Sequence, residues 1–379
     1  MTGGTGSLLE PVPAPASTGT GSGRCGDDGE WLTFWRFSDK HFGYSSVNKE
    51  KEKLCRIVDR FAQKKIAVWG DFILDEYLYG HTRRISREAP VLILSYESRE
   101  FALGGAGNSI LNIKALRATP VPVGVIGADQ SGHRILQMLK KQSVSTEGLI
   151  KDKDYKTPMK TRILAGELST RKQQILRIDQ EVKVPDSIDI RRRLQGRLKN
   201  LQKRVDALLI SDYNYFTVKE SIFTSILPHF KKAKIPVTLD SRFRLLRFKG
   251  VTAATPNEPE VEGVLNVKLD DNLQTLKQSG RYLLKTLKAR SLLITRGSKG
   301  MALFEKDKLP FLIPIHGPKD IVDVTGAGDT VISVFTLALA CGATFKEAAL
   351  IANHAGGIVV MKRGTATLTP EELKESVIS

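Results

Sequence analysis

The amino-acid sequence predicts an α/β protein in which a mostly parallel central sheet carries helices on both faces. Two observations support this fold class. Short apolar runs of strand length alternate with longer amphipathic stretches from residue 66 to the end of the chain. Asp71, Asp212 and Asp240 each follow a predicted strand directly. Because ligands of such sheets bind beyond the carboxyl ends of the strands, these three carboxylates are predicted to lie at the binding crevice.

The first half of the pattern begins with an amphipathic helix at residues 49–64 and a short buried strand at residues 66–69. Gly104 opens a helix that is predicted to continue to residue 116. The other elements of this half are strands at 91–96, 121–126, 159–165 and 173–178, with the last two paired, and a helix at 131–141. Strands within residues 77–103 and 159–179 are predicted to form a small β lid.

The second half repeats the alternation of apolar strands and amphipathic helices. Its predicted helices lie at 188–204, 218–232, 273–287, 326–341 and 345–362. Its predicted strands lie at 207–210, 236–239, 251–254 and 291–294, followed by a hairpin of residues 301–304 and 309–314. No internal repeat of solenoid length is present. The strands outside the lid are therefore predicted to form one sheet that helices cover.

Composition restricts the class of partner. The chain has 58 Lys and Arg against 41 Asp and Glu, a net charge of +17, which favours anionic partners. The basic residues are dispersed and only 7% of residues are aromatic, so nucleic-acid binding by base stacking is not predicted. No run of 18 apolar residues occurs, so no membrane span is predicted. The three cysteines are far apart and show neither metal nor disulfide spacing, which favours a reducing, cytoplasmic location.

Residues 1–48 are predicted to be a disordered or weakly ordered extension of a single domain at 49–379. Residues 1–29 contain eight glycines among many Ser, Thr and Pro residues and show no core pattern. They lack the basic start and the apolar centre of a signal peptide. Their glycine-rich pieces are not phosphate loops, since no strand precedes them and no Gly-Lys-Ser/Thr follows.

The most informative segment is Asp323-Val-Thr-Gly-Ala-Gly-Asp329-Thr. Gly326, Ala327 and Gly328 allow a tight turn and expose backbone N–H groups at a helix start, where a phosphate or an oxyanion binds. Asp329 lies at the same helix start. Phosphoryl transfer to a hydroxyl requires this arrangement, because a base takes the alcohol proton while the cradle holds the γ-phosphate. The simpler alternative is a glycine-rich turn whose Asp caps its helix.

Three motifs resemble those of the ribokinase-like family of carbohydrate kinases. They are the segment at 323–330, Gly104-Gly-Ala-Gly-Asn108 and Asn257-Glu-Pro-Glu260, and they occur in the family's order and spacing. The chain has no Walker-type loop, and the Gly-x-Gly-x-x-Gly string at residues 21–26 follows no predicted strand, so the loop at 326–328 itself must hold the phosphate. The resemblance covers residues 66–375. It implies a ribokinase-like fold, an ATP-dependent sugar kinase, and Mg²⁺ as cofactor.

Other segments are similar to the heptose-7-phosphate kinase branch, the kinase half of the bifunctional protein of ADP-heptose synthesis. The longest are Gly70-Asp71-Phe-Ile-Leu-Asp75-Glu-Tyr-Leu-Tyr-Gly80 and Arg84-Ile-Ser-Arg-Glu-Ala-Pro90. Ser211-Asp212-Tyr213, Lys160-Thr-Arg162 and Lys362-Arg-Gly-Thr365 also fit. This resemblance implies phosphorylation of D-glycero-β-D-manno-heptose 7-phosphate to the 1,7-bisphosphate in the synthesis of the lipopolysaccharide core. Many members carry a nucleotidyltransferase domain after the kinase, which we do not expect within these 379 residues.

The family resemblance implies a role for each motif residue. Asp329 is expected to be the base, and Gly326, Ala327 and Gly328 the anion hole. Asn257 and Glu260 are expected to position Mg²⁺ and the ATP phosphates, and Thr295, Gly297 and Asn353 to border the adenosine, although Asn353 is equally interpretable as a core polar residue. Asp323 and the Thr325 carbonyl are candidate ligands of a monovalent cation such as K⁺.

The sugar is expected to contact a second set of residues. Those implied by the resemblance are Asp71, Gly104, Gly105, Asn108 and Asp212. A sugar phosphate also needs Lys or Arg, and the candidates in the lid half are Arg84, Lys160, Arg162 and Arg177. Each alone is as readily interpreted as a surface charge.

The chain departs from the heptose kinase pattern on the expected substrate side. The usual Ser-Asp-Tyr-x-Lys-Gly reads Ser211-Asp212-Tyr213-Asn214-Tyr215-Phe216, so the lysine and the glycine are missing. Asp-Pro-Lys reads Asp240-Ser241-Arg242, and Gly107 stands where the pattern has alanine. Kinase chemistry is therefore better supported than the heptose substrate. A kinase of another sugar or sugar phosphate is one alternative, and a non-catalytic regulatory or nucleic-acid-binding protein on this fold is another. The expected partners are ATP and a sugar phosphate, with a homodimer through lid residues 91–96.

Overall fold

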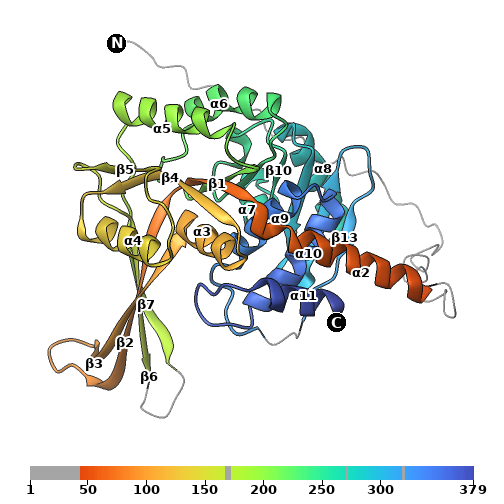
Figure 1. Cartoon of the computed structure of the whole chain (residues 1–379). Helices are drawn as coiled ribbons and strands as arrows, with labels where there is room; N and C mark the ends of the chain where they lie inside the picture. Colours follow the sequence, from red (N-terminus) through yellow and green to blue (C-terminus); the bar gives the residue numbers. More distant parts are fainter. Residues whose placement is uncertain (1–42, 167–171, 270–271, 318–320) are drawn as a thin grey trace, which may run out of the picture. The chain divides into compact units, whose positions relative to one another are not determined.

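The computed structural model describes residues 43–166, 172–269, 272–317 and 321–379 (Figure 1). The chain divides into two compact units, residues 1–49 and 50–379, and the second unit contains the strands and the candidate site. Helix α2 (Gly43–Asp59) starts six residues before the predicted residue 49. The predicted extension lies outside the described residues as far as residue 42. No described helix has both the length and the apolar character needed to cross a membrane.

The larger sheet has nine strands in the order β13-β12-β11-β10-β9-β8-β1-β4-β5. Its strands are β1 (Lys65–Gly70), β4 (Thr119–Gly127), β5 (Leu149–Asp152), β8 (Ala207–Asp212), β9 (Val237–Ser241), β10 (Ala253–Ala254), β11 (Ser291–Thr295), β12 (Met301–Glu305) and β13 (Phe311–Ile313). All neighbours from β5 to β11 pair in parallel, while the β11–β12 and β12–β13 pairs are antiparallel. The predicted α/β fold with a mostly parallel sheet is confirmed.

Two apolar cores cover the two faces of this sheet. Ile66 and Val68 of β1 lie in one core, and Ala67 and Trp69 lie in the other, because successive side chains of a strand point to opposite faces. The helices of the first core are α2, α3 (Ala106–Ala115), α4 (Gln130–Lys141), α9 (Ala327–Ala340), α10 (Phe345–Val359) and α11 (Pro370–Ile378). Those of the second are α5 (Ile188–Leu201), α6 (Glu220–Lys232), α7 (Glu258–Leu265) and α8 (Leu273–Leu287).

The lid is a separate four-stranded sheet in the order β3-β2-β6-β7, and it extends away from the nine-stranded sheet (Figure 1). Its strands are β2 (Phe72–Ile85), β3 (Leu92–Gly105), β6 (Met159–Gly166) and β7 (Gln173–Gln180). The predicted pairing of β6 with β7 is confirmed, and the pair is antiparallel. Strand β2 was not predicted as one continuous element, and β3 is longer than the predicted 91–96. Polar and exposed positions interrupt the apolar pattern of both strands, which explains the difference.

Candidate functional site

The candidate site is centred on Asp329, in the first turn of α9. Gly326 precedes this helix with φ 79°, in the left-handed region where glycine is favoured. A Cβ at Gly326 would lie 2.5 Å from Asn108 Nδ2, whereas one at Gly328 would meet nothing within 4 Å. Gly326 therefore allows the chain to turn against Asn108. Open space in front of Gly328 leaves room for an anion at the start of the helix.

Asp329 is held by two donors from distant segments. Asn108 Nδ2 donates to Oδ2 at 2.9 Å, and the Tyr213 hydroxyl donates to Oδ1 at 3.1 Å. Burial raises the pKa of Asp329 to about 7, although the hydrogen bonds from Asn108 and Tyr213 oppose this shift. A carboxylate that titrates near neutral pH is suited to accept the proton of an alcohol. Asn108 is fully buried and contacts this carboxylate, and its predicted contact with sugar stays a prediction.

Asn257 and Glu260 form a capping box at the start of α7. Asn257 Oδ1 accepts from the Glu260 N–H at 2.8 Å, and Glu260 Oε2 accepts from the Asn257 N–H at 3.0 Å. Burial raises the pKa of Glu260 to about 7. Burial, followed by the charges of Glu260 and Asp329, also raises the pKa of Asp240 well above its ordinary value.

This group of carboxylates, in which Asp329 is buried and Asp240 and Glu260 are half-buried, fits a bound cation. A positive ion would offset the repulsion among Asp240, Glu260 and Asp329. Among the described residues, no three His, Cys, Asp or Glu side chains are grouped as a complete metal centre. Mg²⁺ needs only one or two protein carboxylates when substrate phosphates supply its other ligands. The residues present therefore fit Mg²⁺ bound together with a nucleotide.

The residues predicted to border the adenosine lie on two elements. Thr295 ends β11 and forms an isolated parallel bridge with Asn257, so these two are adjacent. Gly297 has φ 54°, and a Cβ there would meet nothing within 4 Å. Asn353 of α10 is buried, and its Nδ2 donates to the Pro314 carbonyl at 2.9 Å. This contact satisfies one donor of Asn353, and its role toward a nucleotide stays a prediction.

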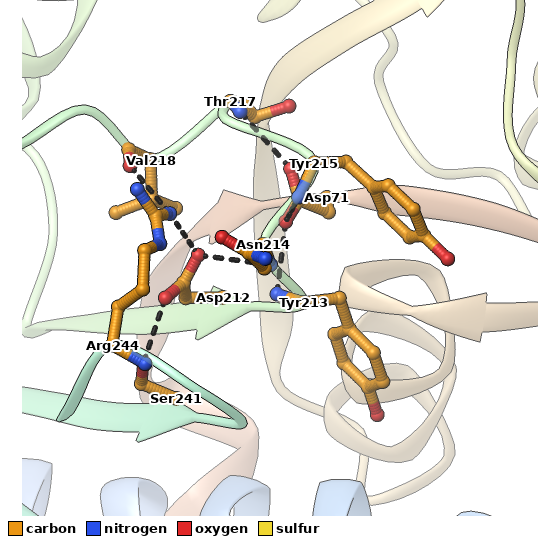
Figure 2. Close-up of polar contacts among 9 residues, drawn as sticks. All are labelled: Asp71, Asp212, Tyr213, Asn214, Tyr215, Thr217, Val218, Ser241 and Arg244. Carbon is orange, nitrogen blue, oxygen red and sulfur yellow. Dashed lines mark hydrogen bonds and ion pairs between the residues drawn. The ribbon is translucent and has the colours of Figure 1, made fainter. Parts of the chain in front are cut away.

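Asp71 and Asp212 form contacts within the protein, and their predicted contact with sugar stays a prediction. Asp71 is 0% exposed, and its oxygens accept from the backbone N–H groups of Tyr213, Tyr215 and Thr217 at 2.8, 3.1 and 3.0 Å (Figure 2). Asp212 accepts from the Ser241 hydroxyl at 2.7 Å and forms an ion pair with Arg244. Because these contacts occupy both carboxylates, they anchor the loop after β8.

Gly104 and Gly105 lie at the end of β3, directly before α3. A Cβ at Gly104 would lie 2.3 Å from Asp75 Oδ2, and one at Gly105, with φ 57°, would lie 2.6 Å from the Asp71 carbonyl. The glycine pair therefore makes room for the side chain of Asp75 and lets the strand turn into the helix. Asp75 was quoted in the sequence motif but was given no function. Its negative charge contributes to the raised pKa of Asp329.

The lid brings together three of the four predicted phosphate-binding cations. Lys160 is paired across the sheet with Asp75 and Asp179, and Arg162 with Tyr77 and Arg177, so these side chains share one face. Arg162 Nη1 donates to Asp75 at 2.5 Å, and Arg177 pairs with Asp179. Lys160 is 9% exposed and has no hydrogen bond or ion pair within the described part of the chain.

Arg84 is separated from these cations. It lies seven residues beyond Tyr77 on β2, which corresponds to roughly 20 Å along a strand, and its side chain is exposed. Within one copy of the chain, Arg84 therefore does not join Lys160 and Arg162. The sequence could not show this, because the length of β2 was not predicted.

A cavity of about 750 Å³ lies between the lid and the loop that precedes α9. Tyr77, Tyr79 and Leu164 line it from the lid, and Asp323, Arg363 and Thr365 line it from the other side. A Cβ at Gly326 would lie 3.3 Å from Thr365, so the cavity borders the turn before Asp329. Asp323 accepts from the N–H groups of Thr325 and Gly364, both at 2.9 Å. Its role as a ligand of a monovalent cation stays a prediction.

Residues 63–372 match the family described as "pfkB family carbohydrate kinase". The chain belongs to this family. It is therefore a sugar kinase, a phosphotransferase with an alcohol group as acceptor, and kinases of this family use ATP, generally with Mg²⁺.

The curated relatives of this kinase include the "Bifunctional protein HldE" of Geobacter metallireducens, which is 37% identical over 307 residues, covering 81% of this chain and 61% of that protein. The protein of the same name from Pelobacter propionicus is 33% identical over 329 residues, covering 86% of this chain and 66% of that protein. The chain thus spans less than two thirds of the length of these relatives.

Solved structures confirm the ribokinase-like fold of this kinase. Arabidopsis thaliana ribokinase, complexed with ribose and ATP, has a TM-score of 0.64 at 20% identity, covering 83% of this chain and 98% of that one. Escherichia coli phosphofructokinase-2 with potassium has a TM-score of 0.66 at 17% identity, with the same coverage. At this identity the likeness concerns the fold alone.

Proposed function

We propose that this kinase phosphorylates D-glycero-β-D-manno-heptose 7-phosphate to the 1,7-bisphosphate with ATP, in the synthesis of ADP-heptose and the lipopolysaccharide core. The motifs of the heptose-7-phosphate kinase branch support this substrate, and relatives that share one name, HldE, support a common function. The observation that carries the chemistry is the buried Asp329 carboxylate, held beside the bare backbone of Gly326–Gly328.

In this proposal each group at the site has one task. Asp329 accepts the proton of the attacking sugar hydroxyl, and the N–H groups of residues 326–328 stabilise the developing negative charge. ATP with Mg²⁺ supplies the phosphoryl group and neutralises the charge of the phosphates. Asn257 and Glu260 would hold that complex, with Thr295, Gly297 and Asn353 toward the adenosine. Asp323 and the Thr325 carbonyl would hold a monovalent cation such as K⁺.

The lid cations give the proposal its preference for a phosphorylated sugar. Lys160 is the strongest candidate, because the residue is only 9% exposed and forms no hydrogen bond or ion pair among the described residues. Burial, followed by the charge of Arg242, lowers its pKa, and a substrate phosphate would offset both effects. Arg162 shares its face of the lid but already pairs with Asp75. We therefore propose Lys160 as the principal phosphate contact, with Arg162 and Arg177 beside it.

We also propose that two copies associate through the lid. Val91, Leu92 and Tyr96 are 56%, 51% and 64% exposed at the far end of β3, which is unusual for large apolar side chains. Measuring the molar mass in solution of the wild type and of the Tyr96→Glu variant tests this association. A wild-type mass of one chain would exclude it.

The deciding experiment is a screen of ATP consumption with heptose 7-phosphate, fructose 6-phosphate, ribose and fructose as acceptors. The proposal expects heptose 7-phosphate to give the highest kcat/KM. A preference for an unphosphorylated sugar would exclude the heptose phosphate but would leave the sugar kinase intact. The missing lysine and glycine at Tyr215 and Phe216 make another sugar phosphate the second candidate. Absence of turnover with every acceptor would favour a non-catalytic regulatory or nucleic-acid-binding role.

A further inference from the structure

The 212–217 loop begins at the last residue of β8. Contacts hold both the backbone and the side chain of Tyr213 in this loop. Figure 2 shows three backbone N–H groups of this loop converging on the carboxylate of Asp71. One of them is the N–H of Tyr213, at 2.8 Å. The phenol hydroxyl of the same residue donates to Asp329 at 3.1 Å. Tyr213 therefore connects a buried anchor, Asp71, with the candidate base.

The backbone of this loop adopts a conformation that its residues do not favour. Asn214 has φ 68° and Phe216 has φ 69°, both in the left-handed region. Asn tolerates this region, whereas a bulky aromatic residue rarely adopts it. Phe216 also occupies the position at which the heptose kinase pattern has glycine. A residue in such a conformation persists only where its surroundings fix it.

Contacts from two other segments, residues 181–183 and Arg244, fix the loop. The guanidinium of Arg244 lies 4.6 Å from the centre of the Phe216 ring, and the ammonium of Lys183 lies 5.0 Å from it. Arg244 also pairs with Asp212 and donates to the Val218 carbonyl at 2.9 Å. The Tyr215 hydroxyl donates to Glu181 at 2.7 Å. The side chains that replace the lysine and the glycine are thus part of the support of the loop.

We propose that Tyr213 is a positioning residue for the Asp329 base, and that Asp71 acts through the 212–217 loop to hold the Tyr213 hydroxyl in place. This inference rests on the proposed function of Asp329. It assigns to Asp71 a task at the base instead of a contact with the sugar. The loop is then preorganised before any substrate binds, because all of its anchors are protein groups.

Several charged groups act on Asp329 besides Tyr213. Asp75 on β2 raises its pKa, and Asp240 and Glu260 are close enough for their own pKa values to be raised by the Asp329 charge. Arg242 acts in the opposite direction on Asp240 and Glu260. The Tyr213 hydroxyl favours the ionised form of Asp329, since a hydrogen bond to a carboxylate lowers its pKa. Removing this donor should therefore raise the pKa of Asp329.

The test compares Tyr213→Phe with Tyr282→Phe, the same change at an exposed tyrosine of α8. Tyr213→Phe should move the acid limb of the kcat/KM profile upward by about one pH unit, as expected for loss of a hydrogen bond to a charged group. Tyr282 is 48% exposed and belongs to neither loop at Asp329, so the acid limb of Tyr282→Phe should coincide with that of the wild type. An unchanged limb in Tyr213→Phe, or an equal shift in Tyr282→Phe, would overturn the inference.

A second measurement does not depend on turnover. Titration of the Asp329 carboxyl carbon by NMR, in the wild type and in Tyr213→Phe, should give a higher pKa in the variant. If no tested acceptor is phosphorylated, the proposed function fails while this titration still decides the contact. An equal pKa in both proteins would refute the contact even if the enzyme is an active kinase.

The role of Asp71 is tested by a double-mutant cycle. Asp71→Asn should shift the acid limb in the same direction as Tyr213→Phe, because a carboxamide cannot accept from all three N–H groups. In the Tyr213→Phe background the same change should cause little additional shift, since its effect passes through the missing hydroxyl. Additive shifts would show that Asp71 acts independently of Tyr213. The melting temperature of each variant distinguishes a shifted limb from partial unfolding.

Discussion

Two loops meet at Asp329, and different kinds of contact hold them. The loop before α9 takes its shape from neighbouring residues, with Gly326 in the left-handed region and Asp329 three residues later in the first helical turn. The 212–217 loop takes its shape from Asp71, which precedes its bonded partners by 142, 144 and 146 residues. The first loop is a local motif and the second depends on tertiary packing. Chemistry and positioning are therefore supplied by parts of the chain with different sensitivity to substitution.

The largest expected effect concerns the local loop. Asp329→Asn should lower kcat by about 10²–10⁴-fold, because an amide cannot take the proton of the sugar hydroxyl. The fold should persist, since the side chain keeps its volume and its place beside Asn108 and Tyr213. Steady-state kinetics and a thermal melt measure both properties. Activity within a few-fold of the wild type would remove Asp329 from the role of base.

The second effect concerns the stability of the distant loop. Arg244→Ala leaves Asp212, whose side chain is 0% exposed, without its ionic partner. Breaking a buried ion pair typically costs about 3–5 kcal/mol, so the free energy of unfolding should fall by an amount of that order. Arg247→Ala, a change at an exposed residue of the short helix η2 (Leu245–Arg247) that directly follows Arg244, is the matched control. Denaturant unfolding of both variants measures the difference, and equal stabilities would contradict the assigned role.

The third effect separates substrate binding from catalysis. Lys160→Ala should weaken binding of the phosphorylated sugar by roughly 10–150-fold, since a contact to a charged group is typically worth about 1.5–3 kcal/mol. Affinity for ATP should stay nearly unchanged, because Asn257 and Thr295, which are expected to contact ATP, lie outside the lid strands. Arg87→Ala, an exposed change between β2 and β3, is the control. Calorimetric titration with both ligands measures these affinities. Wild-type affinity of Lys160→Ala for the phosphorylated sugar would exclude Lys160 as the phosphate contact.

The smallest effect compares two glycines of the local loop. Gly326→Ala should lower stability by about 1–2 kcal/mol, the usual cost of a left-handed non-glycine residue, with an addition from the approach to Asn108. Gly328→Ala places its methyl group in open space and in a helical turn, so its stability should equal or slightly exceed that of the wild type. Melting temperatures of the two variants decide this. A larger loss in Gly328→Ala would contradict the assigned geometry.

Most strands and helices and the glycine turn at residues 326–328 could be predicted, because their sequence signals are local. The buried strands β1, β8 and β11 were predicted to within two residues at each end, since continuous apolar runs mark strands that are covered on both faces. The short strand β5 and helices α7 and α11 were not predicted. Of these, α7 was quoted only as a motif, although Asn257, Pro259 and Glu260 form a recognisable helix start.

The site residues were predicted from motifs, and their roles in binding and catalysis stay predictions. In the structure, Gly326–Asp329 lie at the start of α9, and Asn257 and Glu260 lie at the start of α7. Tyr213 was quoted without a function, because nothing in the sequence shows that its hydroxyl reaches a residue 116 positions away. The carboxylate of Asp71 is satisfied by N–H groups that only the folded loop brings together.

The sequence by itself determined the alternation of strands and helices, the tight glycine turn before α9 and the carboxylate in the first turn of that helix. Each of these follows from residues within a few positions of one another, whose conformational preferences act before the chain folds. Only the tertiary structure decided that Asp71 and Asp212 anchor a loop, that Arg84 lies apart from Lys160, and that Tyr213 contacts Asp329. These outcomes depend on strand register and burial, because a carboxylate buried away from water must find its partners wherever the fold brings donors to it.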